Sequence, residues 1–156
     1  MRVLALDPGE TTGYCIIQWD YARQIRPRED LASYIVTHGQ IASRNLVEQH
    51  QALENLITAF NPDVIVYEKF LLYGHKAAAQ IGSDMYTPQV IGQIKVLCAK
   101  YNKQEISNSA QNAKLFYTDK KLKEHNMWQT GMKHCRDSIR HALYAIDFNL
   151  CKPKRR

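Results

Sequence analysis

The chain opens with MRVLALDPGETTGYCIIQW (residues 1–19), and this stretch decides the fold. Residues 2–6 and 13–19 are apolar and partly β-branched, which is typical of β-strands. The residues between them, Asp7-Pro8-Gly9-Glu10-Thr11-Thr12, are rich in turn-forming types. The opening therefore predicts two strands that are joined by a tight turn, with Asp7 at the end of the first strand.

The rest of the chain changes from strand to helix patterns and back. From Arg44 the apolar residues recur every three or four positions, which predicts a helix that ends at Asn61-Pro62. Residues 63–68 are apolar on both faces, so this strand is expected to be central and parallel. The other expected elements are a polar loop over 20–30, a strand over 33–41, a helix that begins with the cap Thr87-Pro88 and runs to about residue 101, a strand over 104–107, a helix from about Ser109, and a last helix over 130–149. This order predicts an α/β fold, with three antiparallel strands followed by parallel strands in one mixed sheet flanked by helices.

Length and composition are those of one globular domain. The 156 residues have a mass of 18.0 kDa, and 45% of them are hydrophobic. We expect a single domain over 1–150 and a basic tail over 151–156. No stretch reaches the roughly 18 consecutive apolar residues that a membrane helix needs, and the first apolar run is too short for a signal peptide. The four cysteines are scattered, without zinc-site spacing. These features predict a cytoplasmic protein with free thiols that does not bind membranes.

The positive charge is concentrated at one end of the chain. Residues 1–113 carry 10 basic and 11 acidic side chains, whereas residues 114–156 carry 11 basic and 4 acidic ones. A basic flank on a nearly neutral body is typical of proteins that bind a polyanion, most often nucleic acid. For the tail alone, a solvated segment that aids solubility is an equally good interpretation.

Three carboxylates occupy positions that folding alone does not explain. Asp7 ends the first strand and Glu68 ends the fourth, and parallel neighbours present their carboxyl ends at the same edge of a sheet. Two carboxylates at one edge repel each other unless a cation lies between them, and Mg²⁺ and Mn²⁺ prefer such oxygen ligands. The third is Asp137 on the last helix.

A projection of the last helix places its polar residues together. His134, Asp137, His141 and Tyr144 share one sector and Arg140 borders it, while Cys135, Ile139, Ala142, Leu143 and Ile146 lie opposite. We expect the apolar side to pack and the polar side to be presented. Laid against the strand ends, this helix would complete a cluster of Asp7, Glu68 and Asp137, with His134 one turn away.

Three segments together resemble a known family. They are residues 6–13 (LDPGETTG), residues 64–70 (VIVYEKF) and residues 134–143 (HCRDSIRHAL). In order and spacing they resemble the catalytic blocks of RuvC-type Holliday-junction resolvases of the RNase H-like nuclease superfamily. The resemblance implies an RNase H-like fold and a homodimer that cuts four-way DNA junctions with Mg²⁺ or Mn²⁺, two ions per active site. It carries catalytic and metal-ligand roles onto Asp7, Glu68, Asp137 and His134.

Two positions depart from the family pattern, and both suggest a compact member of the kind that bacteriophages carry. Relatives commonly place a junction-wedging Phe three residues after the catalytic Glu, whereas Phe70 comes two residues after Glu68. His134 stands where many relatives have a second acid, and it is a candidate either to ligate a metal or to shuttle a proton.

Basic and aromatic residues near these blocks are candidates for nucleic-acid contact. Phe70 and Tyr73 lie between Lys69 and Lys76, and their rings are candidates to stack on unpaired bases or to cover a helix. The candidates for phosphate contacts are Lys114, Lys120, Lys121, Lys133, Arg136 and Arg140.

Three other functions fit parts of the sequence. One is an RNase H-like nuclease that acts on RNA:DNA hybrids, or a flap or debranching nuclease of broad preference. The second is a non-catalytic nucleic-acid-binding module of the same fold. The third is an actin-like or Hsp70-like ATPase, because residues 7–13 also resemble the phosphate loop of that class. Such ATPases need two domains of this kind, and 156 residues supply one.

Overall fold

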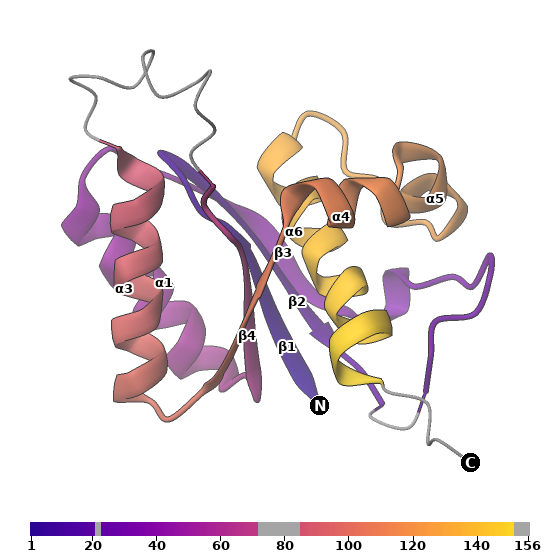
Figure 1. The fold of residues 1–156 in the computed structure, drawn as a ribbon, viewed down its shortest axis with the longest axis horizontal. Coiled ribbons are helices and arrows are strands. Elements are labelled where there is room, and N and C mark those ends of the chain that lie inside the picture. Colours follow the sequence, from indigo (N-terminus) through magenta and orange to yellow (C-terminus); the bar gives the residue numbers. More distant parts are fainter. Residues whose placement is uncertain (21–22, 72–84, 152–156) are drawn as a thin grey trace.

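A single five-stranded mixed sheet organises the computed structural model, which describes residues 1–20, 23–71 and 85–151 (Figure 1). The strands are β1 (Arg2–Asp7), β2 (Thr11–Gln18), β3 (Ile35–Ala42), β4 (Val64–Glu68) and β5 (Gln104–Asn108), in the spatial order β3-β2-β1-β4-β5. The pairs β1–β2 and β2–β3 are antiparallel, and β1–β4 and β4–β5 are parallel. The predicted mixed sheet, with β4 inside it, is confirmed.

Helices cover both faces of the sheet. They are α1 (Leu46–Phe60), α3 (Tyr86–Lys100), α4 (Ala110–Phe116), α5 (Asp119–Glu124) and α6 (Lys133–Ala145), with a short 3-10 turn η1 (Ala32–Tyr34) and a π-helical turn η3 (Ile146–Leu150). Figure 1 shows α1 and α3 on one side of the sheet, and α4, α5 and α6 on the other. No helix within the described residues is long and apolar enough to cross a bilayer.

The alternating strand residues build one core on each face. On the α6 side, Val3 and Ala5 of β1 pack in a cluster with Ile139 of α6. On the other side, Leu4 of β1 belongs to a cluster with Ile94 of α3. Because strands buried on both faces need apolar residues at successive positions, the continuous apolar runs of β1 and β4 explain their central places.

The helix boundaries differ from expectation where local capping decides them. The second long helix begins at Tyr86, two residues before Pro88, and its N-cap Met85 has a left-handed backbone without a side-chain cap. The predicted cap at Thr87 is therefore wrong. The short helix α5 was not expected from the sequence; it begins at the capping side chain of Thr118, which accepts a hydrogen bond from the Lys121 amide.

The expected division of the last helix into a packed side and a presented side is also wrong. Asp137, Arg140 and His141 are buried together with the apolar residues of α6. The reason is that α4 packs against α6 and Asp137 and Arg140 form ion pairs beneath α4 and α5. Periodicity finds the polar stripe of a helix, but a second layer of helices can cover that stripe.

Gly13 of β2 allows α6 to approach the sheet closely. A Cβ atom at this position would lie 2.0 Å from the carbonyl oxygen of His134 and 2.7 Å from the amide nitrogen of Cys135. Gly13 is also the register partner of Asp7. The absence of a side chain at Gly13 therefore brings the start of α6 to the end of β1.

We expect the substitution Gly13→Ala to lower the free energy of unfolding by on the order of 3 kcal/mol, because α6 and β2 must separate to accept the methyl group. Urea denaturation measures this change. The matched control is Gly9→Ala, where the new Cβ would have only ordinary contacts at 3.6 and 3.7 Å, so we expect little change in stability. Equal effects of the two substitutions would contradict the close approach of α6.

Candidate metal centre

Two carboxylates meet at one edge of the sheet because two parallel strands end there. Asp7 is the last residue of β1 and Glu68 is the last residue of β4, and the register pairs Leu6 with Tyr67 just before them. This is the juxtaposition that the sequence predicted. Asp7 is buried, and Glu68 is partly exposed.

The turn after Asp7 is held from two sides. The Thr12 hydroxyl donates to the Gly9 carbonyl over 3.1 Å. The buried Gln49 side chain of α1 donates to the carbonyl oxygens of Gly9 and Glu10 over 3.1 and 2.9 Å. Because both backbone oxygens are satisfied by protein groups, the turn keeps one conformation and sets the position of Asp7.

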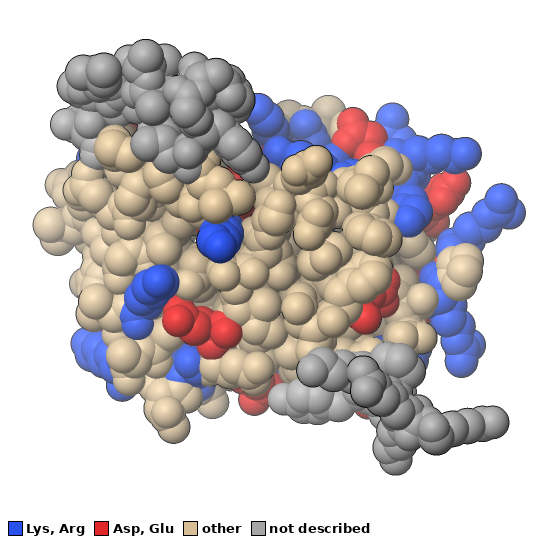
Figure 2. Space-filling view, viewed as in Figure 1, with Lys and Arg blue, Asp and Glu red and all other residues tan. Residues whose placement is uncertain are grey.

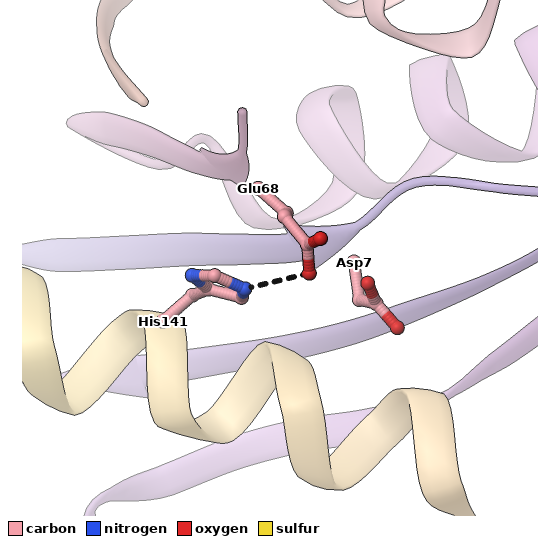
Figure 3. Close-up of side chains that lie close together, drawn as sticks. All are labelled: Asp7, Glu68 and His141. Atoms are coloured by element: carbon pink, nitrogen blue, oxygen red, sulfur yellow. Dashed lines mark hydrogen bonds and ion pairs between the residues drawn. The ribbon is translucent and has the colours of Figure 1, made fainter. Parts of the chain in front are cut away.

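A histidine from α6 completes the group at the strand ends. His141 has no exposed surface, and its Nε2 lies 3.2 Å from Oε2 of Glu68. Each of Asp7, Glu68 and His141 offers one ligand atom, and these three atoms lie within 4.8 Å of one another. Figure 3 shows the Glu68 carboxylate between the imidazole and Asp7.

The electrostatics of the group favour a bound cation. Burial, together with the nearby charges of Glu68 and Asp137, raises the pKa of Asp7 from 3.8 to about 8. Burial also acts to raise the pKa of Glu68, but the hydrogen bond and charge of His141 outweigh it and hold that pKa below the usual 4.5. Two oxygen ligands and one imidazole suit a divalent ion such as Mg²⁺ or Mn²⁺, which would relieve the repulsion.

His134 and Asp137 of α6 both lie near Asp7. Nδ1 of His134 is 2.7 Å from Oδ2 of Asp7, and the amide of His134 donates to the Gln40 side chain over 3.1 Å. Asp137 is buried and forms ion pairs with Arg140 and, at 3.2 Å, with Nζ of Lys114. The structure thus brings His134 to Asp7, as expected, but it places His141 rather than Asp137 in the compact group.

The sequence pattern contained the signal for His141. The residue lies four positions after Asp137 and seven after His134, in the polar sector that the helix projection identified. It was not among the candidate ligands because the three resembling segments assign no role to that position. Only its distance from Glu68 in the folded chain reveals it.

A cavity of about 780 Å³ opens at the carboxylates, large enough for part of a polymeric substrate. Besides Asp7 and Glu68, its lining includes Phe70, Lys114 and His134. A second cavity of about 440 Å³ adjoins it, because Lys114 lines both. The second cavity is also lined by Lys133, Arg136, Asp137 and Arg140.

The predicted nucleic-acid contacts divide into three groups. Lys69, Lys114 and Lys133 are exposed, and Arg136 is partly exposed. Arg140 is buried, and its guanidinium bonds Asp137, Asp119 and the Tyr117 carbonyl, so this side chain joins α6 to α4 and α5 and its hydrogen bonds are used within the protein rather than for the expected phosphate contact. Tyr73 and Lys76 lie outside the described residues.

Comparisons with known proteins bear on the fold. No protein-family model and no curated protein sequence matches the chain. Thermus thermophilus RuvC, solved in complex with a Holliday junction substrate, matches with a TM-score of 0.66 and 13% identity over 93% of this chain and 95% of that one. The fowlpox virus Holliday junction resolvase matches with a TM-score of 0.60 and 15% identity over 94% and 99% of the two chains.

A third solved structure agrees with these two. The yeast mitochondrial Holliday junction resolvase matches with a TM-score of 0.53 and 17% identity, over 94% of this chain and 76% of that one. The chain therefore has the fold of RuvC-type resolvases, and the predicted RNase H-like architecture is confirmed.

We expect the metal-free protein to lose stability as the pH rises from about 5 to about 8. The folded state keeps a proton on Asp7 up to a pKa of about 8, whereas the unfolded chain releases it near 3.8, so the folded state binds more protons in this range. Urea unfolding in the presence of a chelator should show a decrease of a few kcal/mol across this interval.

The substitution Asp7→Asn is the control for this pH dependence, because the amide has no proton to lose. Its stability should vary much less between about pH 5 and about pH 8. An unchanged slope in this variant would show that another group causes the dependence.

Proposed function

Because the chain has the fold of RuvC-type resolvases, we propose that it is a metal-dependent endonuclease that resolves four-way and related branched DNA junctions. One observation carries this proposal: two strand-end carboxylates and a buried imidazole converge at the sheet edge, beside a cavity with basic walls. The matching RuvC structure holds a Holliday junction substrate.

We propose Mg²⁺ or Mn²⁺ as the cofactor, with two ions per active site. Asp7, Glu68 and His141 would hold these ions, and Asp137 and His134 would be further ligands. When bound, such ions supply an activated water and stabilise the departing 3′ oxygen of a phosphodiester. An imidazole ligand suits Mn²⁺ better than Mg²⁺, so His141 favours Mn²⁺.

The chain's own residues perform the remaining tasks. Burial of Asp7 and His141 keeps bulk water away from the reacting phosphate. Lys114 and Arg140 hold Asp137 in place, and Lys114 must release this carboxylate for it to act as a ligand. With about half of its side chain exposed, Lys114 is free to turn toward a phosphate in the adjoining cavity. His134, on Asp7, is placed to accept or deliver a proton.

The substrate contacts follow from the walls of the cavities. We propose that Lys69, Lys114, Lys133 and Arg136 contact phosphates, and that Phe70, in the cavity at the carboxylates, contacts an unpaired base. We also propose that residues 1–150 act as a single nuclease domain. The basic tail at 151–156 lies almost entirely outside the described residues.

We further propose that the active form is a homodimer with α3 at or beside the interface. A junction with two scissile strands has two-fold symmetry, which a two-fold dimer matches. Val90, Ile94 and Leu97 of α3 pack toward the sheet, but Val96 points outward and is 61% exposed.

For the dimer, we expect light scattering at micromolar concentration to report twice the 18.0 kDa mass of the chain. The substitution Val96→Glu should shift the particle toward the single-chain mass, because it buries a charge in the interface. A wild-type particle of 18.0 kDa would contradict the dimer.

For the activity, we expect Mn²⁺- or Mg²⁺-dependent cleavage of a four-way junction in preference to a flap, a linear duplex or an RNA:DNA hybrid. Asp7→Asn, Glu68→Gln and Asp137→Asn should each lower the cleavage rate at least about 100-fold and leave junction binding in place, because they remove ligand charge without removing phosphate contacts. His141→Gln should weaken Mn²⁺ binding, measured by calorimetry, more than Mg²⁺ binding.

Different outcomes of this assay distinguish the alternatives. If the protein cleaves the hybrid or the flap in preference to the junction, that nucleic acid is the substrate. Full activity in any of the carboxylate variants would remove that residue from the site. Binding without cleavage of any substrate, with either metal, would favour the non-catalytic module.

A further inference from the structure

The loop between β2 and β3 carries a basic turn that the proposed site does not use. Arg26 and Arg28 flank Pro27 at its tip, and all three are exposed. The Glu29 amide donates to the Arg26 carbonyl over 3.3 Å, which closes a tight turn. Pro27 and Arg28 occupy its two central positions, and Arg28 has a φ of 55°. Glycine adopts this backbone at lower cost, so the side chain of Arg28 is retained against a local strain.

This loop is fastened to the body of the protein. Leu31 is buried in the core beneath it, and its amide donates to the His125 carbonyl over 3.0 Å. Nδ1 of His125 in turn bonds the Glu29 carbonyl at 2.7 Å, and the Ile25 amide donates to the Asp147 carboxylate over 3.2 Å. The two arginines therefore project from a supported turn, and a ligand need not order them.

Basic side chains recur between this turn and the metal centre, and we call them the basic band. Arg26, Arg28 and Lys121 of α5 line one cavity of about 280 Å³. Farther along, Lys123 and Arg136 both lie over the ring of Trp128, at 4.8 and 4.4 Å from its centroid. Arg136, Lys133 and Lys114 then line the cavity that adjoins the carboxylates. Figure 2 shows Lys and Arg side chains gathered along the upper right and the right edge, over α5 and this loop.

The cations of the band have no ion-pair partners in the part of the chain that the structure describes. Among the described residues, Arg26, Arg28, Lys121, Lys123, Lys133 and Arg136 form no ion pair. The acidic side chains nearby are engaged elsewhere, since Glu29 pairs with Arg23, Glu124 with Lys120, and Asp119 with Arg140. Asp147, which lines the same cavity as Arg26 and Arg28, accepts hydrogen bonds from the Ile25 amide and the Tyr117 hydroxyl. Lys123 and Arg136 both contact the ring of Trp128 although their charges repel each other. A bound polyanion would reduce this repulsion.

We infer that this band binds the phosphate backbone of one duplex arm of the DNA substrate, with Arg26 and Arg28 as its contacts farthest from the metal centre. The inference rests on the proposed nuclease function and extends it to a second surface. A duplex is the partner that fits, because it presents a regular row of phosphates along a rigid axis, and the band is a row of cations on rigid supports.

Binding of a four-way junction without divalent metal tests the inference. For the double variant Arg26→Gln/Arg28→Gln, the slope of log affinity against log salt should be smaller by about 1.8, because each lost phosphate contact removes about 0.9. The ratio of wild-type to variant affinity should consequently change about 12-fold between about 50 mM and about 200 mM salt. The cleavage rate at saturating protein should stay unchanged, since neither residue reaches the metal centre.

Three further variants make the result specific. Arg26→Lys/Arg28→Lys keeps the charges and should keep the wild-type slope. Lys103→Gln removes one charge from the turn that follows α3, outside both the band and the proposed interface helix, and should also keep the wild-type slope. Arg28→Gly should lower the slope by about 0.9 without loss of stability, because glycine relieves the positive φ.

The outcomes separate this inference from the proposed function. Junction cleavage by the wild type, with equal salt slopes for wild type and Arg26→Gln/Arg28→Gln, would overturn the band and leave the nuclease intact. A decrease of about 0.9 in Lys103→Gln would also overturn the band, since the effect would then be one of net charge. A wild-type chain that neither binds nor cuts DNA would overturn the nuclease proposal itself.

Discussion

The register between β1 and β4 places the carboxylates of Asp7 and Glu68 side by side. The rest of the structure depends on how the repulsion between these two groups is reduced. Backbone hydrogen bonds hold Asp7 beside Glu68, and burial removes much of the water that would screen them. In the protein alone, a proton retained on Asp7 and a bond from His141 to Glu68 reduce the repulsion. A divalent cation would do so more completely, which is why we regard the cluster as a metal centre.

Helix α6 brings the second half of the centre to the sheet. Its first turn reaches Asp7 because Gly13 has no side chain, and its polar sector is then enclosed by α4 and α5. Arg140 is the link, since its guanidinium bonds Asp137 on its own helix and both Asp119 and the Tyr117 carbonyl outside it. A buried arginine with all these partners is satisfied, and truncating one partner would leave a costly buried charge.

The basic residues are arranged differently from the acidic ones. The acids at the centre are wholly or partly buried and are positioned by strands and by α6, whereas most of the cations are exposed and lie on α5, on the start of α6 and on the loop before β3. Affinity for a polyanion depends on exposed cations along its path, and hydrolysis depends on a few fixed ligands. In the proposed nuclease, the residues that bind the substrate are thus different from those that hydrolyse it. Lys114, which lines both cavities, lies where the two sets of residues meet.

Local residue patterns were sufficient for the five strands and their mixed sheet, the central place of β4 and the meeting of Asp7 with Glu68, because each depends on apolar periodicity and on the direction of parallel strands. The same patterns placed His134, Asp137 and His141 on one helix sector, but they favoured Asp137 as the third member of the group, a place that His141 takes in the structure. That choice depends on the neighbours of each side chain: Lys114 and Arg140 engage Asp137, while His141 bonds Glu68. Such pairings join residues from different elements, so only the packing of α4, α5 and α6 on the sheet decides them.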